Sequence, residues 1–136
     1  MVNQDNINIV IKFMPPAQRI AFLQALNSSE RQYFEEVINR LADTIKSAPV
    51  IYGTDGLKAD EIKPVLHYFG GIVDIYLTEI DTSEYNQHYG YTSLGLGCLE
   101  GGYVELEYIF NELPLLNLDL HFKPETITTY KRKHEG

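Results

Sequence analysis

The stretch that decides the fold runs from residue 64 to residue 124. It reads PVLHYFGGIVDIYLTEID over 64–81, HYGYTSLGLGCLEGGYVELEYIF over 88–110 and LDLHFKP over 118–124. Apolar and polar residues alternate along it, tyrosine is frequent, and glycine pairs interrupt the pattern where strands would turn. Alternation of this kind is typical of strands with one buried face. The stretch therefore predicts an antiparallel sheet.

Two helices are expected before this sheet. Residues 17–26 and 29–46 carry apolar residues at helical spacing, and a short polar turn separates them. Such a pair makes an antiparallel helical hairpin. Residues 6–13 predict a short strand or a packed lead-in, and residues 50–52 suit a short edge strand. The predicted fold class is α+β, an N-terminal helical hairpin with a small, mainly antiparallel β-sheet of four to five strands.

The 136 residues are expected to form a single domain with three subregions. Residues 1–48 are the helical hairpin, 49–125 the acidic β-sheet subregion, and 126–136 a basic tail that is expected to be flexible. No apolar run reaches the roughly 20 residues of a membrane helix, and the N-terminus lacks a signal-peptide pattern. A single cysteine, Cys98, fits a reducing compartment. We therefore expect a cytoplasmic protein without a membrane partner.

Charge is concentrated in the sheet subregion. The formal net charge of the chain is −8, yet residues 1–48 balance to zero and residues 126–136 carry +2. Residues 49–125 hold thirteen acidic and three basic side chains, a net charge of −10. Such a surface repels nucleic acid backbones and attracts basic protein surfaces, although excess acidic residues also favour plain solubility. We expect a protein partner with a basic surface and no direct binding of nucleic acid.

Tyrosine is the second functional signal, because the chain has ten tyrosines and no tryptophan. A tyrosine beside carboxylates suits a protein interface, since it contributes a large ring and a hydrogen-bonding tip. The alternative is that these rings pack beneath the helical hairpin. The candidate protein-binding surface consists of Asp74, Tyr76, Asp81, Tyr85, Tyr89, Tyr91 and Glu105.

The order of sequence blocks from Ala48 to Tyr130 resembles a small bacterial family, domain of unknown function 2958. The matching blocks are PVIYGTDG (49–56), the run 65–81 ending in LTEID, HYGY (88–91), GYVEL (102–106) and DLHFKP (119–124). They cover about 80 of the 136 residues. The chain departs from the family at 71–76, where GIVDIY stands in place of a tryptophan-bearing strand.

Members of that family look like accessory genes of plasmids and integrative elements, with no established chemistry. Together with the acidic sheet, the resemblance implies a non-enzymatic accessory protein of a mobile element that binds a basic protein surface. Such a protein would act as an anti-defence or anti-CRISPR-like inhibitor of a host complex that targets nucleic acid.

Two functions of other classes stay open. His67, His88 and His121 lie on three predicted strands and, with nearby aspartates, would serve a small enzyme or a metal-binding domain, although closely spaced zinc-ligand pairs are missing. The apolar stripe of the second helix would instead serve a homo-oligomeric structural module. The glycine-rich residues 95–102 predict a hairpin turn and not a phosphate loop, because a strand pattern follows them. The sequence assigns no catalytic residue, no metal ligand and no cofactor.

Overall fold

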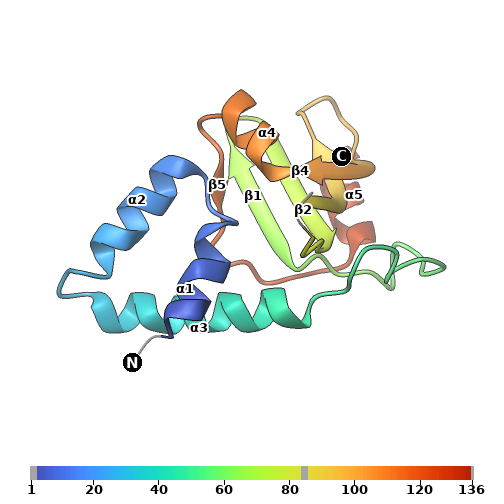
Figure 1. Cartoon of the computed structure of the whole chain (residues 1–136). Coiled ribbons are helices and arrows are strands. Elements are labelled where there is room, and N and C mark those ends of the chain that lie inside the picture. The colour runs from blue at the N-terminus through green and yellow to red at the C-terminus, as the bar shows by residue number, and fades with distance from the viewer. Residues whose placement is uncertain (1–2, 84–85, 136) are drawn as a thin grey trace. The chain divides into compact units, whose positions relative to one another are not determined.

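The computed structural model describes residues 3–83 and 86–135, and within them it forms five helices and one five-stranded sheet (Figure 1). The helices are α1 (Gln4–Ile11), α2 (Pro16–Ala25), α3 (Arg31–Ser47), α4 (Leu106–Glu112) and α5 (Ile127–Glu135). The strands are β1 (Leu66–Gly70), β2 (Val73–Glu79), β3 (Gln87–Ser93), β4 (Glu100–Glu105) and β5 (Asn117–Leu118). The predicted α+β class, with N-terminal helices and a small antiparallel sheet, is confirmed.

The chain divides into two compact units, Met1–Ser47 and Ala48–Gly136. The first unit holds α1, α2 and α3, and the second holds the sheet with α4 and α5. The dividing point lies next to the predicted border between the helical and the acidic subregions. No helix in the described part of the chain is both long enough and apolar enough to cross a membrane.

The prediction of a strand at residues 6–13 is wrong, because this segment belongs largely to helix α1. Asn3 caps the helix, and its side chain accepts a hydrogen bond from the Asp5 backbone N–H at 2.8 Å. Ile7 and Val10, three residues apart, are both buried. The run of β-branched residues imitates a strand, whereas the cap and the three-residue spacing select a helix.

The two helices expected as a hairpin are present as α2 and α3. The side chains of Asn6 in α1 and Asn39 in α3 hydrogen-bond at 3.0 Å, so α1 packs along α3. The apolar stripe of α3 is buried; it consists of Val37, Ile38, Leu41, Ala42 and Ile45. This stripe therefore belongs to the core and is not a free surface for self-association.

The sheet has the strand order β4-β3-β2-β1-β5, and neighbouring strands run antiparallel. β1 and β2 are joined by a two-residue turn at Gly71 and Ile72, one residue later than the predicted Gly70-Gly71 turn, and Gly71 has a φ of +58°. β5 contributes only two residues, opposite Tyr68 and Phe69. β2 is therefore the central strand, with two neighbours on each side.

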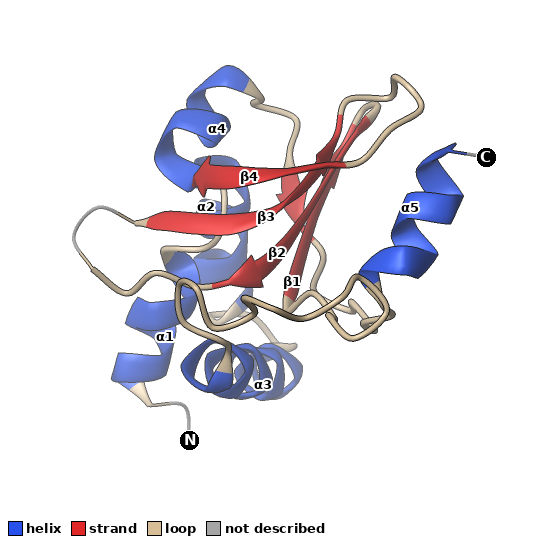
Figure 2. Cartoon of the chain, turned by 90° about the vertical axis from the view of Figure 1, so that its right-hand side faces the viewer, coloured by secondary structure: helices blue, strands red, loops and turns tan. Residues whose placement is uncertain are grey.

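The central strand β2 is largely buried on both faces of the sheet. One face carries Ile75 and the adjacent Tyr68, and α4 covers it with Phe110, whose ring centroid lies 5.8 Å from that of Tyr68. The opposite face carries Tyr76 and is covered at one end by α5. Figure 2 shows α4 and α5 on opposite sides of the strands.

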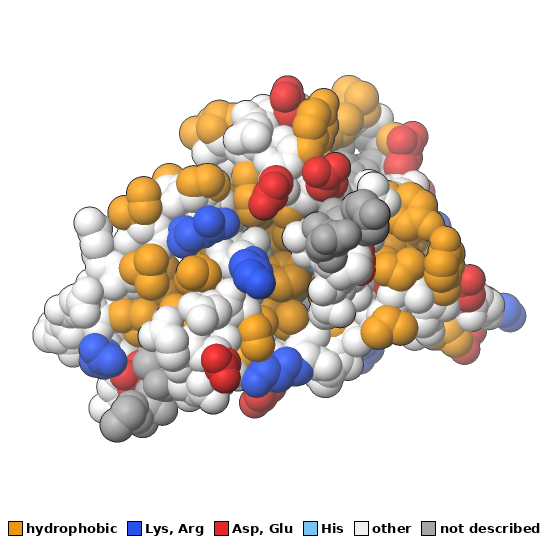
Figure 3. Space-filling view, viewed as in Figure 1, with side chains coloured by type: hydrophobic (Ala, Val, Ile, Leu, Met, Phe, Trp, Pro, Cys, Tyr) orange, Lys and Arg blue, Asp and Glu red, His pale blue; other side chains and the backbone are white. Residues whose placement is uncertain are grey.

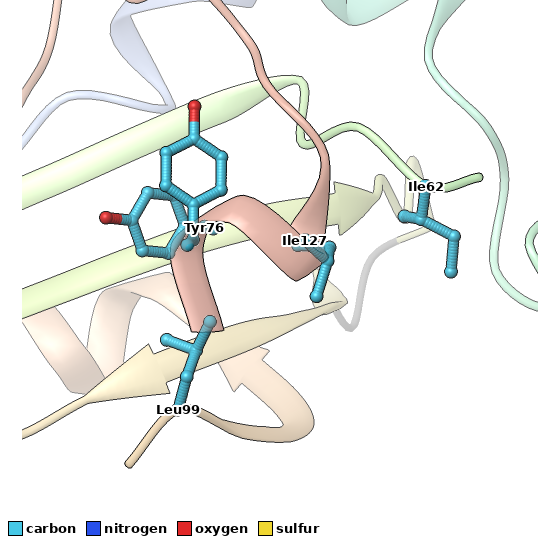
Figure 4. Packing of buried hydrophobic residues seen from close by; sticks show 5 residues of the cluster. Ile62, Tyr76, Leu99 and Ile127 are labelled. Atoms are coloured by element: carbon cyan, nitrogen blue, oxygen red, sulfur yellow. The ribbon is translucent and has the colours of Figure 1, made fainter. Parts of the chain in front are cut away.

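The C-terminal tail is not a frayed segment, because residues 127–135 form helix α5. Ile127 and Tyr130 are buried against Tyr76, with Ile62 and Leu99 completing the cluster (Figure 4). The rings of Tyr76 and Tyr130 stack with centroids 4.2 Å apart. Ile127 and Tyr130 lie three residues apart and so share one side of a helix whose other side is charged, which anchors the tail to the sheet.

The surface repeats the uneven charge of the sequence. On the face shown in Figure 3, acidic side chains gather around α4 in the second unit, whereas most basic side chains lie over the N-terminal helices. The acidic sheet subregion therefore presents negative charge at the surface.

Candidate functional site

The Tyr76 face of the sheet continues past α5 into a cavity of about 240 Å³ that is lined by tyrosines. Tyr89 and Tyr91 come from β3, Tyr103 from β4, and Tyr52 from the segment before β1. We call this site the tyrosine cavity. Its other lining residues are Thr54, Asp55, Gly56, Leu57, Ile62 and Glu79.

Strand register brings the aromatic rings of the tyrosine cavity together. Tyr91 lies opposite Tyr76, and Tyr89 lies between Glu79 and Tyr103 in adjacent strands. The ring of Tyr89 is nearly perpendicular to those of Tyr91 and Tyr103, at 87° in both pairs, with centroids 6.1 and 5.6 Å apart. The Tyr103 hydroxyl donates to the Tyr52 hydroxyl at 3.2 Å. The rings thus stand as walls at right angles to one another.

Gly101 makes room for two of these rings. A Cβ atom at this position would lie 2.8 Å from the Tyr89 hydroxyl and 3.1 Å from Cε1 of Tyr91. Both distances are shorter than ordinary van der Waals contacts, so any side chain here would displace the rings. The glycine that the sequence places in a turn therefore lies in β4 and shapes the cavity.

Glu79 lies at the base of the tyrosine cavity and is only 3% exposed. A bulge between Leu77 and Glu79 turns its side chain to the tyrosine face. Its Oε1 accepts the Tyr52 N–H at 2.9 Å, and its Oε2 accepts the Thr54 N–H at 3.1 Å and the Thr54 hydroxyl. None of these three donors carries a charge, so they satisfy the carboxylate and leave its negative charge in place.

The prediction of an edge strand at residues 50–52 is wrong, because residues 51–56 form turns. Tyr52 has a φ of +68°, a left-handed conformation that is uncommon for residues other than glycine. This conformation accompanies the hydrogen bond from the Tyr52 N–H to Glu79. The hydrogen bonds to Glu79 therefore hold the turn in place, and the turn carries the Tyr52 ring to the edge of the cavity.

Burial, hydrogen bonding and nearby charges together raise the pKa of two phenols in the cavity. Burial raises the pKa of Tyr91, and the charges of Tyr89 and Glu79 raise it further. The hydrogen bond with Tyr52 raises the pKa of Tyr103, and the charges of Glu79 and Asp55 raise it further. Both phenols therefore stay neutral at pH 7 in a negative field. Lys131 of α5 already places its Nζ 5.6 Å from the centroid of the Tyr91 ring.

The structure brings together part of the predicted binding surface. Tyr89 and Tyr91 line the tyrosine cavity, and Glu105 is exposed two residues after Tyr103 in β4. Asp81 lines an adjoining cavity of about 480 Å³ that shares Tyr52 and Tyr103 with the first. Tyr85 lies outside the described residues.

Tyr76 is buried and Asp74 is partly exposed, and both lie in a network of paired polar and aromatic groups. Tyr76 is 1% exposed, so its prediction as a contact residue is wrong. Its hydroxyl lies 2.9 Å from Nε2 of His134, and burial raises its pKa, with Asp74 and Tyr130 adding to the effect. The Asp74 carboxylate is bound to Nε2 of His67 at 2.7 Å. The physical reason is that α5 covers this end of the face.

The histidines do not converge on a catalytic or metal site. His67 contacts Asp74 through Nε2 at 2.7 Å and Asp119 through Nδ1 at 3.1 Å. Each of its ring nitrogens therefore has a carboxylate partner. Both contacts are hydrogen bonds only when the ring carries both protons. His88 lies on the other face of the sheet, so the predicted convergence is wrong. Within residues 3–83 and 86–135, no three His, Cys, Asp or Glu side chains are arranged to hold a metal ion.

His88 anchors the loop that precedes β3. Its Nδ1 accepts the Asp81 backbone N–H at 3.0 Å. Burial lowers the pKa of His88 to about 4, against a weaker opposite effect of Asp81. Hydrogen bonds from the backbone and side chain of Ser83 lower the pKa of Asp81, and the Gln87 N–H adds to them. The histidine is therefore a neutral acceptor at pH 7.

Three important residues were missing from the predicted surface: Tyr52, Glu79 and Tyr103. The hairpin pattern contained a signal for Tyr103, because pairing the two strands in register places it beside Tyr89. Glu79 is the last residue of an apolar strand, and a charged residue at such a position is normally predicted to face solvent. Only the bulge turns it inward. Tyr52 is 37 residues before Tyr89, and no local pattern joins them.

Comparisons of the chain with protein-family models, with curated proteins and with solved structures give no match. The resemblance to domain of unknown function 2958 therefore stays a prediction.

Proposed function

We propose that this chain binds a protein with a basic surface through the tyrosine cavity and the carboxylates around it. The observation that supports this function is the convergence of four tyrosines on the buried Glu79, within a subregion of net charge −10. Tyrosine is among the residues that dominate the energy of protein interfaces, because its large ring costs little side-chain entropy when it is fixed.

The tyrosines are accessible enough to serve this role. Tyr52 is 66% exposed and Tyr103 is 58% exposed, so a partner would bury much of both rings. The exposed Asp55 and Glu105 flank them. Carboxylates at the rim contribute mainly to the rate of association and to its salt dependence, whereas buried rings contribute to the lifetime of the complex.

The resemblance described above extends the proposal to a biological setting. An accessory protein of a mobile element would occupy the basic, nucleic-acid-binding surface of a host defence complex and so inhibit it. An acidic surface suits that role because it attracts the same cationic side chains that bind phosphate. The role requires no catalysis.

The test is a pull-down with the tagged protein from nuclease-treated bacterial lysate, washed at low and at high salt. We expect a stoichiometric partner at low salt that is lost at high salt. Tyr89→Ala combined with Tyr103→Ala should abolish its recovery. Tyr108→Ala is the matched control, because Tyr108 is 60% exposed on α4, on the other side of the sheet.

Charge reversal separates local recognition from net charge. Asp55→Lys with Glu105→Lys changes the net charge from −8 to −4, as does Glu107→Lys with Glu112→Lys on α4. Only the first pair should release the partner. Equal loss with both pairs, or a partner that survives the double tyrosine variant, would overturn the proposal, and so would failure to recover a partner at either salt.

A further inference from the structure

The size of the tyrosine cavity limits its occupant. Pockets for drug-sized ligands and cofactors span about 300–1,000 Å³. At about 240 Å³, the tyrosine cavity has room for one side chain or a small ion and not for a nucleotide. The part of a ligand that enters the tyrosine cavity is therefore a single chemical group.

The charge of the cavity selects a cation. The three hydrogen bonds to Glu79 come from uncharged donors, so its negative charge is not neutralised by them. The faces of the surrounding rings are also negative, because aromatic rings carry a quadrupole. Lys131 already sits near the Tyr91 ring, which shows that this ring is accessible to an ammonium group from the α5 side.

The hydrogen bonds within the cavity discriminate among cations. A guanidinium binds a carboxylate best through two parallel bonds to its two oxygens, but both oxygens of Glu79 already accept backbone N–H groups. An unmethylated ammonium needs acceptors for three N–H groups once it leaves water. Glu79 has about one lone pair left of roughly four, and the hydroxyls of Tyr52 and Tyr103 bond to each other.

A methylated ammonium does not leave N–H donors unsatisfied, because methyl groups replace them. The positive charge is distributed over these apolar methyl groups, which need no hydrogen-bond acceptor. From this geometry we infer that the tyrosine cavity is a binding site for a methylated ammonium group, such as the end of a trimethyl-lysine side chain. The inference rests on the proposed function, since it names the group of the partner that the cavity receives.

The direct test uses choline and its uncharged isostere 3,3-dimethylbutan-1-ol, which differ only in the central nitrogen or carbon of the trimethyl group. Each is titrated into the full chain labelled with ¹⁵N, and backbone amide shifts are followed. Choline should shift the amides of Tyr89, Tyr91 and Tyr103 with a Kd on the order of millimolar, as expected for so small a ligand. The isostere should bind at least about threefold more weakly. Equal binding of both compounds, or no shift with choline, would overturn the inference.

Amino acid probes then test the choice of cation. Nα-acetyl-trimethyl-lysine amide should bind at least about threefold more tightly than the unmethylated lysine and arginine analogues. A preference for arginine would mean that the Glu79 oxygens are available to a guanidinium, and it would contradict the inference.

Three variants locate the site. Tyr103→Ala should weaken choline binding at least about threefold, whereas Tyr108→Ala should leave it unchanged. Lys131→Met should strengthen it about twofold or more, because it removes a positive charge that lies beside the Tyr91 ring. A structural disturbance would weaken binding in every variant, so the gain at Lys131 distinguishes recognition from misfolding. Weaker binding by Lys131→Met would count against the site.

Failure of this inference is distinguishable from failure of the proposed function. If a salt-sensitive partner depends on Tyr89 and Tyr103 while choline does not bind, the cavity makes a protein contact of another kind and the inference is wrong. If choline binds as described but no partner is recovered, protein recognition is wrong and the chemical specificity stands.

Discussion

Two tyrosines on the same face of the sheet lie in opposite surroundings. Tyr76 of β2 is 1% exposed beneath Ile127 and Tyr130 of α5, whereas Tyr103 of β4 is 58% exposed at the rim of the tyrosine cavity. We call these the closed end and the open end of the face. Each of these strands carries a single tyrosine, and α5 covers only the one in β2, so the covering element decides which ring is buried.

The polar groups at the two ends differ in the same way. At the closed end, polar and aromatic groups contact one another, as His67 does with Asp74 and Asp119. At the open end, Glu79 is held by uncharged donors and keeps its charge. Polar groups that are partnered with one another are already satisfied within the fold, whereas a carboxylate held only by uncharged donors is available to a cationic ligand. The closed end therefore holds the fold, and the open end is the candidate for recognition.

The largest expected effect is a difference in stability between a variant at the closed end and a variant at the open end. Tyr76→Ala should lower the free energy of unfolding by about 3–5 kcal/mol, because it leaves a cavity beneath α5. Tyr103→Ala should change it by less than about 0.5 kcal/mol, because the ring is exposed. Chemical denaturation of both variants measures the difference. Similar losses for both would show that the open end is part of the core.

Tyr76→Phe controls for the hydroxyl. It keeps the ring that stacks on Tyr130 and removes the hydrogen bond to His134. The expected loss is about 1 kcal/mol. A loss as large as that of Tyr76→Ala would mean that the hydrogen bond, and not packing, attaches α5 to the sheet.

A second effect should appear with pH and involves the loop beside the open end. The pKa of His88 is about 4 in the folded chain, against about 6.5 for an unperturbed histidine. Between these values the unfolded chain binds a proton that the folded chain does not, so lowering the pH from 6.5 to 4 destabilises the fold. The loss from this group should reach about 3 kcal/mol and should not grow further at lower pH. Urea denaturation at steps between pH 7 and pH 4 measures it.

His88→Asn is the control for this titration. Its side-chain oxygen keeps an acceptor for the Asp81 N–H but does not titrate in this range. The variant should be less stable at pH 7, since a smaller side chain fills a buried site, and its stability should fall less between pH 6.5 and pH 4. An unchanged pH dependence would assign the acid sensitivity to other groups.

Local patterns were sufficient to predict the sheet. Alternation along residues 73–79, a glycine pair before them and the apolar helical stripe within residues 31–47 each depend on neighbours in the chain. Pro114 follows the end of α4 at Glu112, because proline cannot continue a helix. Such features follow from strand and helix geometry, which fixes where side chains point over a few residues.

The candidate site depends on contacts that no local pattern reports. The hydroxyls of Tyr52 and Tyr103 meet across 51 residues, and Glu79 reaches the face only through a bulge. The prediction of a flexible tail at residues 126–136 is wrong for a similar reason. Ile127 and Tyr130 are two apolar residues in a charged segment, and their burial depends on Tyr76, which lies 54 residues earlier than Tyr130. Tertiary packing decides such cases, because an isolated short helix is only marginally stable.

The smallest expected effect tests whether the open end stores backbone strain. Tyr52 has a φ of +68°, where glycine is unstrained and other residues pay roughly 1 kcal/mol or more. Tyr52→Gly and Tyr52→Ala both remove the ring and its hydrogen bond to Tyr103, so the difference between them isolates the backbone. The glycine variant should be more stable than the alanine variant by about 0.5–1 kcal/mol, measured by thermal and urea denaturation. Equal stabilities would show that the turn is relaxed in solution. A more stable glycine variant that has lost choline binding would show that backbone strain at this turn accompanies the placement of an aromatic ring at the edge of the cavity.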